Sequence, residues 1–157
     1  MTVDGVSPVV RVPGYADEVP PPVETLYDLR TPLLAQGITT DWRAHTDHLS
    51  IAIKVYADGG ENRMHAHNYE DHSFVVLAGQ ATFHIGTDDN VKVLNKWDGV
   101  LLPKDTQYWF QSTPSEGNLV MIRVAAKIPG VVPAPMDKSF FPERIELPGM
   151  FFPDDCK

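Results

Sequence analysis

Fourteen prolines are divided between the two ends of this chain, and their placement limits where a β-sheet can form. Six lie at or before Pro32 and six at or after Pro129, so only Pro103 and Pro114 fall between these groups. Proline has no N–H to donate to a sheet ladder, so the middle of the chain can be rich in strands while its ends cannot. We therefore expect a proline-rich N-terminal extension (1–32), one folded domain (33–128) and a tail rich in proline and aromatic residues (129–157).

The middle of the chain consists of short β-rich runs separated by turn residues, without a 3.6-residue period. In the run 49–56 apolar residues alternate with others, and Asp58-Gly59-Gly60 ends it. Further runs lie at 72–77, 81–85, 91–94, 99–102, 107–110 and 119–125, with a short extended piece at 64–67. Short strands with tight turns between them predict an all-β domain, either a sandwich or a closed barrel.

The two ends carry signals of ordered structure. Thr25 is spaced as the cap of a helix, which Pro32 would end within about two turns. Four of the seven phenylalanines lie at 140, 141, 151 and 152, and disordered segments are usually poor in aromatic residues. We expect the C-terminal tail to pack along the domain or across a neighbouring subunit.

The charge balance excludes two classes of partner. Lys and Arg number 13 against 21 Asp and Glu, which gives a net charge of −8, whereas nucleic acids and anionic membranes need a basic face. No apolar run reaches the roughly 20 residues of a membrane helix, and the N-terminus lacks the order of a signal peptide. The single cysteine, Cys156, cannot form an intramolecular disulfide. These features favour the reducing cytoplasm.

Three of the six histidines fall within residues 65–72, which read H-A-H-N-Y-E-D-H. Residues two apart on a strand face the same side, so His65 and His67 would present both imidazoles together. His72 begins the next strand on the face that carries Phe74 and Val76, and the bend between the two pieces can bring them side by side. Three converging imidazoles suit a divalent transition metal. The alternative is that one or two are ordinary core histidines and the rest are exposed.

The spacing of these histidines resembles the first motif of the cupin superfamily. Residues 60–79 read G-x4-H-x-H-x4-H-x6-G. The cupin motif is G-x5-H-x-H, then three or four residues, then Glu, six residues and Gly, so its first glycine corresponds to Gly59. Residues 97–112 resemble the second cupin motif, with Asp98 and Pro103 in place and Trp97 and Asp105 where glycines are usual. In the same motif Ser112 replaces the terminal asparagine.

The resemblance covers about residues 45–126. It implies a double-stranded β-helix, or jelly-roll barrel, of about six to eight strands. It further implies a homodimer with one divalent transition metal in the mouth of each barrel.

Two departures from the cupin pattern affect the expected metal site. His72 stands where cupins carry a glutamate, and Tyr108 stands at the position of the usual histidine of the second motif. Asp71 and Glu70 are alternative ligands to His72, but only His72 keeps the six-residue spacing to Gly79. We therefore expect His65, His67 and His72 to hold the metal, with Asp71 pointing to the opposite face of its strand. Three neutral imidazoles would leave the metal a strong Lewis acid that favours an anionic or chelating substrate.

Tyr108 has four possible roles in such a site. It can bind the metal as a phenolate, donate a hydrogen bond to bound oxygen or substrate, act as a general acid or base, or form part of the aromatic wall with Trp109 and Phe110. A free tyrosine has a pKa of about 10, which favours the neutral donor over the phenolate. Among the other histidines, we expect His45 and His48 at the surface, whereas His84 can face either the cavity or solvent.

These residues favour an enzyme that uses a mononuclear non-haem Fe(II) site and O2 to oxidise a small chelating substrate, such as an enol, diketone, phenol or thiol. His65, His67 and His72 would bind the metal, and Tyr108 would orient the substrate. The alternatives are non-redox isomerase or lyase chemistry with Zn, Ni or Mn, and a non-catalytic barrel that binds a small molecule. The superfamily alone does not choose among them, because one fold can carry many functions.

Overall fold

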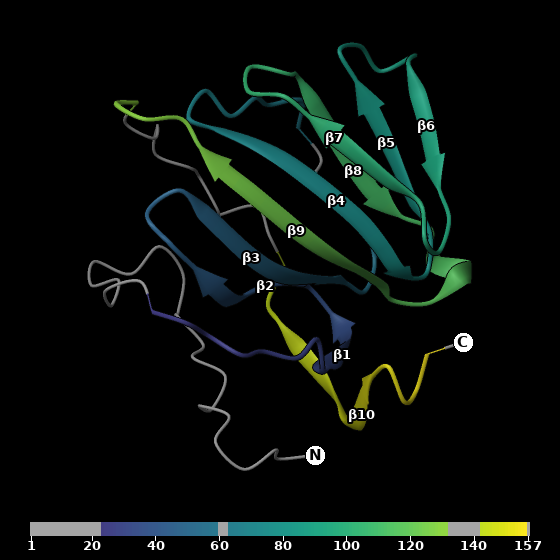
Figure 1. Ribbon diagram of the computed structural model, residues 1–157. Helices are drawn as coiled ribbons and strands as arrows, with labels where there is room; N and C mark the ends of the chain where they lie inside the picture. The colour runs from purple at the N-terminus through teal and green to yellow at the C-terminus, as the bar shows by residue number, and fades with distance from the viewer. Residues whose placement is uncertain (1–22, 60–62, 132–141, 157) are drawn as a thin grey trace.

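The computed structural model describes residues 23–59, 63–131 and 142–156. Within these ranges the elements are β1 (Thr31–Gln36), β2 (Ile38–His45), β3 (Leu49–Tyr56), β4 (Glu70–Ala78), β5 (Ala81–Ile85), β6 (Val91–Leu94), β7 (Gly99–Leu102), β8 (Tyr108–Ser112), the 3-10 turn η1 (Pro114–Glu116), β9 (Leu119–Lys127) and β10 (Ile145–Phe152). The strands pair antiparallel in three sheets (Figure 1), which confirms the predicted all-β fold. No helix in the described ranges is long and apolar enough to cross a membrane.

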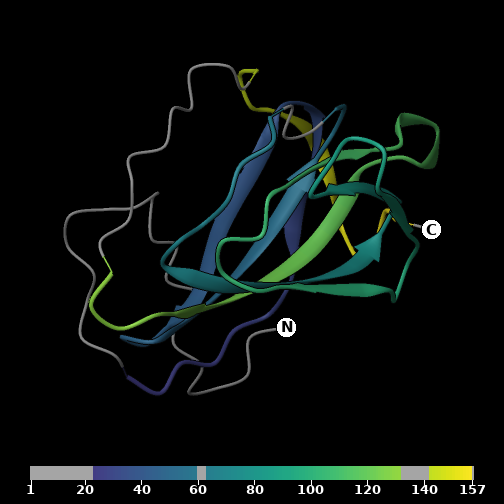
Figure 2. The same ribbon diagram turned by 90° about the horizontal axis from the view of Figure 1, so that it is seen from above.

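A five-stranded sheet in the order β2-β3-β9-β4-β7 forms the centre of the fold. The sheet β6-β5-β8 packs on one face of it and the two-stranded β1-β10 ribbon on the other (Figures 1 and 2). Alternation along β9 shows how one sheet serves two cores. Leu119 and Met121 are buried toward β6-β5-β8, whereas Val120 between them is buried toward the ribbon. Successive side chains of a strand point to opposite faces, so apolar residues at consecutive positions cover both.

The inner core, between the central sheet and β6-β5-β8, is dominated by aromatic rings. Its buried residues are Tyr56, Phe74, Val76, Ala81, Phe83, Leu102, Tyr108, Phe110, Leu119 and Met121. The rings of Phe83 and Phe110 stack with centroids 4.8 Å apart, and Phe74 lies against both. Tyr108 connects this core to the histidine segment, because its backbone forms an isolated bridge with His65. The inner core therefore ends at the residues expected to bind metal.

The outer core lies beneath the β1-β10 ribbon, which the sequence analysis did not predict. It buries Leu33 and Leu34 of β1 against Ile53, Val55 and Val120, with Leu147 and Phe152 of β10 packed around them. The expectation that the proline-rich ends lack strands was wrong: Pro32 lies in β1 and Pro148 in β10. Each strand of a two-stranded ribbon has one free edge, where a proline's missing N–H leaves no partner unsatisfied. The tail's Phe140 and Phe141 lie outside the described residues.

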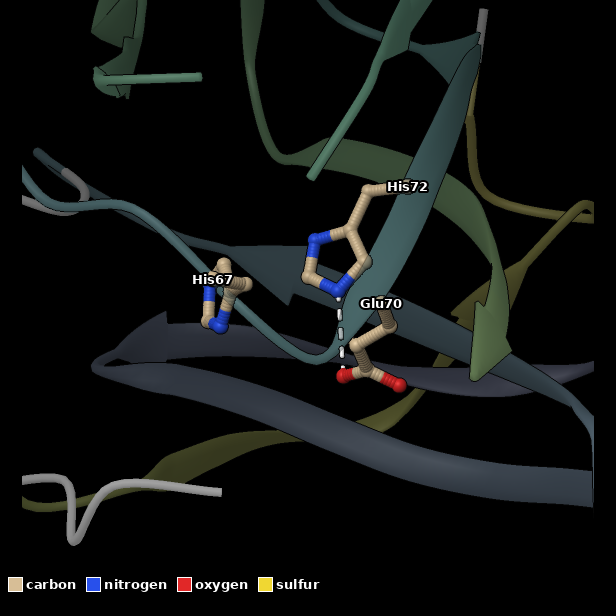
Figure 3. A group of neighbouring side chains, drawn as sticks. All are labelled: His67, Glu70 and His72. Carbon is tan, nitrogen blue, oxygen red and sulfur yellow. Dashed lines mark hydrogen bonds and ion pairs between the residues drawn. The ribbon is translucent and has the colours of Figure 1, made fainter. Parts of the chain in front are cut away.

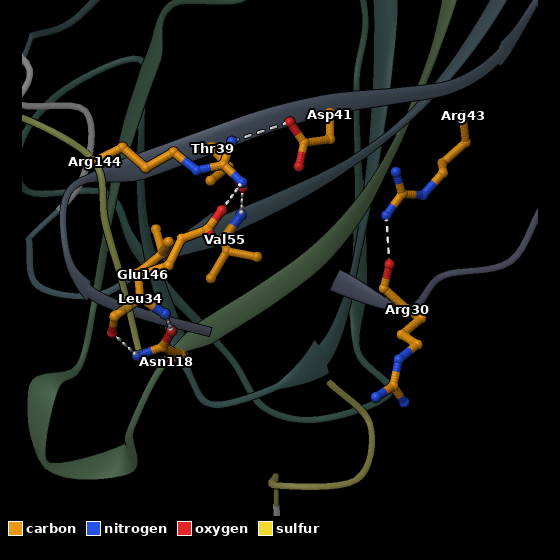
Figure 4. A network of polar contacts seen from close by, with 9 residues as sticks. All are labelled: Arg30, Leu34, Thr39, Asp41, Arg43, Val55, Asn118, Arg144 and Glu146. Carbon is orange, nitrogen blue, oxygen red and sulfur yellow. Dashed lines mark hydrogen bonds and ion pairs between the residues drawn. The ribbon is translucent and has the colours of Figure 1, made fainter. Parts of the chain in front are cut away.

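Polar contacts fasten the ribbon to the central sheet (Figure 4). The Asn118 side chain accepts a hydrogen bond from Leu34 N at 2.7 Å and donates one to Leu34 O at 3.0 Å, in the manner of a neighbouring strand. Arg144 links Asp41 of β2, at 3.3 Å, to Glu146 of β10, at 2.7 Å. Arg43 donates to the carbonyl of Arg30 at 2.6 Å. The ribbon is thus held by directed contacts as well as by apolar burial.

Most strands predicted for the middle of the chain are present. The runs 49–56, 81–85, 91–94 and 99–102 have the predicted bounds, whereas β4 and β9 are longer and β8 begins one residue later than predicted. The predicted extended piece at 64–67 is only the single bridge at His65. The predicted helix at Thr25 is wrong, because residues 23–30 are not helical. There the Thr25 hydroxyl donates to Val23 O at 2.9 Å instead of accepting from a helix N–H.

Candidate metal centre

Strand β4 places two donor side chains inside the fold. Glu70, His72, Phe74 and Val76 alternate onto the inner face and are buried. Asp71 points to the opposite face, as expected, and its Oδ1 accepts a hydrogen bond from Lys104 N at 2.7 Å. The alternation that buries Phe74 and Val76 therefore also carries Glu70 and His72 inward, and it removes Asp71 from the candidate ligands.

Three donor atoms converge in front of β4 (Figure 3). One atom each from His67, Glu70 and His72 lies within 4.8 Å of the other two, and all three residues are buried. His72 Nε2 lies 3.1 Å from Glu70 Oε1. The rings of His67 and His72 have centroids 4.4 Å apart. Two imidazoles and a carboxylate in this arrangement form a candidate site for a divalent transition metal.

The observed spacing agrees with what such a metal requires. In the facial arrangement of two histidines and one carboxylate around an octahedral ion, neighbouring ligands about 2.1 Å from the ion lie at right angles and are separated by about 3 Å. The 3.1 Å between Glu70 Oε1 and His72 Nε2 is close to this value, so both atoms can bind one ion with little displacement. The donor set therefore fits a metal, with Glu70, an alternative ligand in the sequence analysis, beside His67 and His72.

His65 lies beside this donor group. Its ring centroid is 5.0 Å from that of His67 and 4.6 Å from that of Tyr108. Its Nδ1 lies 2.9 Å from the carbonyl oxygen of Arg63. Of the three histidines expected as ligands, His67 and His72 thus lie with Glu70 in the donor group. His65 is adjacent to His67 but lies outside this group.

Tyr108 points inward and contacts the second ring nitrogen of His72. The Tyr108 hydroxyl lies 3.2 Å from His72 Nδ1, and the tyrosine is 2% exposed. His72 is therefore held at both ring nitrogens, by Tyr108 on one side and by Glu70 on the other. A metal-binding histidine commonly uses its other nitrogen in such a hydrogen bond, which fixes its tautomer and orientation.

The protonation states of the group suit metal binding. Burial lowers the pKa of His72, with a further contribution from the positive charge of Arg123, although the hydrogen bond with Glu70 opposes the shift. Burial tends to raise the pKa of Glu70, but His72, Arg123 and His67 together outweigh it and hold that pKa below its usual value. At neutral pH His72 is therefore neutral and Glu70 ionised, the forms in which both bind metals.

The remaining histidines lie away from the candidate centre. His84 is on the outer face of β5, where its ring stacks on Trp109 at 3.9 Å and its Nδ1 lies 2.8 Å from Asp88 O. His84 therefore faces away from the inner core. His48 is exposed and His45 half-buried.

Sequence reasoning gave little weight to Glu70 and did not consider Lys54 or Arg123. All three are buried. The alternation of inward and outward side chains could have identified two of them. Glu70 lies two residues from His72 on one strand, and Arg123 lies two and four residues from Met121 and Leu119 on another.

Two residues in the segment that resembles the second cupin motif have a backbone conformation that favours glycine. Trp97 has φ of 77° and Asp105 has φ of 66°, and within the described ranges these are the non-glycine residues with positive φ. Both occupy positions where the sequence analysis expected glycine. Positive φ is unfavourable for residues with a Cβ, so both residues adopt a conformation that glycine would adopt at lower cost.

The fold and the donor group together define a class: a small antiparallel β-fold with buried histidine and carboxylate side chains on the inner face of its central sheet. No protein-family model matches the chain. No curated protein matches it significantly.

Solved structures do match. KdgF from Halomonas sp. is 20% identical, with a TM-score of 0.53 over 59% of this chain and 82% of that chain. A proposed mannose-6-phosphate isomerase from Ralstonia eutropha JMP134 is 14% identical, with a TM-score of 0.56 over 62% and 91%. An RmlC-like cupin from Shewanella frigidimarina is 18% identical, with a TM-score of 0.50 over 61% and 81%. The chain has the cupin fold, which confirms the resemblance seen in its first motif.

Proposed function

We propose that this protein is a metal-dependent enzyme with one divalent transition metal, Fe(II) by preference, held by His67, Glu70 and His72. The observation that carries the proposal is the convergence of three buried donor atoms within 4.8 Å. Two histidines and one carboxylate with further positions left for other ligands are the donor set of non-haem Fe(II) oxygenases. His65 remains a fourth candidate ligand because its ring is adjacent to that of His67.

A bound metal would supply a Lewis acid for a small chelating substrate and a site for O2 chemistry. The residues of the chain prepare this site. Tyr108 holds His72 by its Nδ1, so that Nε2 points toward Glu70 and the donor group. Phe74 packs edge-on against the His72 ring and reduces access of water to it from the core side. The proposed reaction is an O2-dependent oxidation of an enol, diketone, phenol or thiol.

The first experiment measures metal and oxygen together. Wild type, His67→Ala and the control His84→Ala are reconstituted anaerobically with Fe(II), desalted and analysed for metal. We expect about one equivalent of iron in wild type and in His84→Ala, and none in His67→Ala. Oxygen uptake is then followed with catechol, acetylacetone and cysteine as probes. Absence of metal from the folded wild-type protein would overturn the proposal.

Non-redox chemistry with Zn, Ni or Mn is the second candidate. Its support is the structural likeness to a protein proposed to be a mannose-6-phosphate isomerase. Retention of only zinc or nickel, with turnover that is equal under nitrogen and air, would favour this function over the oxygenase.

A further inference from the structure

Two basic side chains are buried on the inner face of the central sheet, next to the candidate metal centre. Lys54 of β3 and Arg123 of β9 are each 5% exposed. Lys54 pairs with Met121 and Ala52 pairs with Arg123, so the two cations are diagonal neighbours on adjacent strands. Arg123 also pairs with Phe74, one inward position along β4 from His72. Both positive charges act on His72, whose pKa they help to lower.

Arg123 has an edge that lacks a hydrogen-bond partner. Its Nε and Nη2 atoms are buried, and no described residue accepts a hydrogen bond from either. The guanidinium lies over the Trp42 ring, with Cζ 4.7 Å from the ring centroid, which fixes its plane. Glu70 is near enough for the charge of Arg123 to lower its pKa, but it makes its hydrogen bond with His72.

A buried guanidinium without acceptors is unfavourable for folding, and such groups are normally paired. The Nε–H and one Nη2–H of an arginine lie parallel on the same side of the guanidinium. This edge matches the two coplanar oxygens of a carboxylate, which it binds in a bidentate manner. Phosphate oxygens can form the same bidentate contact, so the choice between the two ligands rests on charge. The ionised carboxylate of Glu70 lies close enough to interact with Arg123, and it opposes a doubly charged phosphate more strongly than a singly charged carboxylate.

We propose that the edge of Arg123 binds the carboxylate of a small organic acid, with Lys54 contributing a second positive charge. The inference rests on the proposed function in one respect: it makes this acid the substrate whose other end reaches His67, Glu70 and His72. The substrate class is thereby narrowed from chelating compounds in general to those that also carry a carboxylate. Arg123 selects and orients the substrate, and it takes no part in bond making.

The experiment uses benzoate as the carboxylate probe and metal-free full-length protein, so that its result is independent of the metal. The Nε–Hε signals of 15N-labelled arginines report directly on the guanidinium, and Arg123→Lys assigns the signal. We expect benzoate to shift the Arg123 signal, and Arg123→Met to weaken benzoate binding by about tenfold or more. Arg144→Met, which removes a surface arginine, should bind as wild type does. Sodium chloride and sodium phosphate at equal ionic strength are the anion controls.

Thermal unfolding of the ligand-free variants provides the second measurement. The Nε–Nη2 edge of Arg123 has no acceptor among the described residues, whereas its charge interacts favourably with Glu70. These opposing contributions should leave the Tm of Arg123→Met close to that of wild type. Two results would overturn the proposal. One is an Arg123 signal that benzoate does not move, or moves no more than phosphate does. The other is an Arg123→Met protein that unfolds well below wild type, since this would assign Arg123 to the fold. Benzoate binding without any metal binding would sustain the anion site and refute only the metal centre.

Discussion

Glu70 and His72 lie two residues apart on the inner face of β4, with Glu70 Oε1 3.1 Å from His72 Nε2. One strand therefore delivers two of the three donor atoms at a fixed spacing, since the regular pleat sets the distance between alternate side chains. His67 completes the group from the segment that precedes β4. The candidate metal centre thus depends on the register of a strand that is itself held between β9 and β7.

The first prediction concerns the ligand set. Glu70→Gln removes a charged donor but keeps its size, so we expect this variant, like His67→Ala, to lose Fe(II) on desalting. Asp71→Asn is the matched control, because Asp71 lies on the opposite face of the same strand and should retain about one equivalent. Elemental analysis of the folded proteins checks this. A Glu70→Gln protein with full metal content would return the site to the three histidines.

His65→Ala separates the two ligand sets further. The His65 ring is next to His67 but outside the group of three donor atoms, so we expect the variant to retain iron. Loss of the metal from His65→Ala and from Glu70→Gln alike would show a centre with four protein ligands.

The second prediction concerns Tyr108 as a positioning residue. Tyr108→Phe keeps the ring in the inner core and removes the hydroxyl that contacts His72 Nδ1. Loss of such a partner typically weakens metal affinity by about 10–100-fold. Competition with a chelator measures the change, and circular dichroism verifies the fold. Trp109→Phe, on the other face of β8, is the control and should bind metal as wild type does. An affinity equal to wild type in Tyr108→Phe would make Tyr108 a wall residue only.

The third prediction concerns the pH dependence of stability in the metal-free protein. The pKa of His72 is lowered from 6.5 by its burial, so below this pH the unfolded chain binds a proton that the folded protein does not. Stability should therefore fall as the pH drops below about 6.5. Glu70, whose pKa is lowered from 4.5 by its neighbours, adds a further loss at lower pH. Arg123, Lys54 and His67 face the pair.

Urea denaturation between pH 8 and pH 5 measures this slope. In His72→Asn the loss between pH 6.5 and pH 5.5 should shrink, because the titrating group is gone. Tyr108 also contacts His72, and Tyr108→Phe should keep the direction of the slope. A wild-type protein whose stability rises as the pH falls through this range would contradict the assignment of a neutral, buried His72.

Sequence reasoning succeeded where one face of a strand is apolar. In β3 and β5 the alternation is clear, so both strands have the predicted bounds. Sequence reasoning missed β2, which carries Asp41 and Arg43 and ends at His45. Asp41 contacts Arg144 and Arg43 contacts the Arg30 carbonyl, so these positions are set by polar partners and not by an apolar alternation that the sequence would show. It missed β10 because Pro148 and Gly149 lie within it, and only pairing with β1 makes such a sequence a strand.

Contacts that form only in the folded chain also limited what the sequence could predict about the site. The histidine spacing located the centre, but the weight given to the six-residue spacing to Gly79 set Glu70 against His72 as alternatives. The strand places both on one face, where they act together. Alternation within β9 can place Arg123 on the inner face, but its position beside the candidate centre follows only from the pairing of β9 with β4, a contact between distant parts of the chain.

The fourth prediction follows from the left-handed backbone at Trp97. Its side chain is 70% exposed, so Trp97→Gly removes few contacts and relieves the positive φ. We expect a gain of about 0.5–1 kcal/mol, the relief being partly offset by the greater freedom of glycine in the unfolded chain. Lys96→Gly is the control: the neighbouring residue does not have positive φ and should lose about 0.5–1 kcal/mol. Equal losses in both variants, measured in urea, would contradict the inferred strain.

The fifth prediction separates two costs at the glycine that ends the first cupin motif. Gly79 has φ of +74°, and a Cβ there would lie 2.5 Å from the carbonyl oxygen of Asn118. Gly86 has nearly the same φ, +77°, but a Cβ there would meet nothing within 4 Å. Alanine at either position carries the left-handed penalty of about 1–2 kcal/mol. Only Gly79→Ala must also displace the backbone at the start of β9.

Gly79→Ala should therefore lose about 1–3 kcal/mol more stability than Gly86→Ala, the usual range for forcing atoms into a packed site. Urea denaturation of the two variants gives the difference directly. Asn118 also holds Leu34 of the ribbon, so a displaced Asn118 should loosen β1 as well as the turn. Hydrogen exchange of the Leu34 amide should then be faster in Gly79→Ala and unchanged in Gly86→Ala. Equal destabilisation of the two variants would mean that φ alone, and not the close approach of Asn118, requires glycine at position 79.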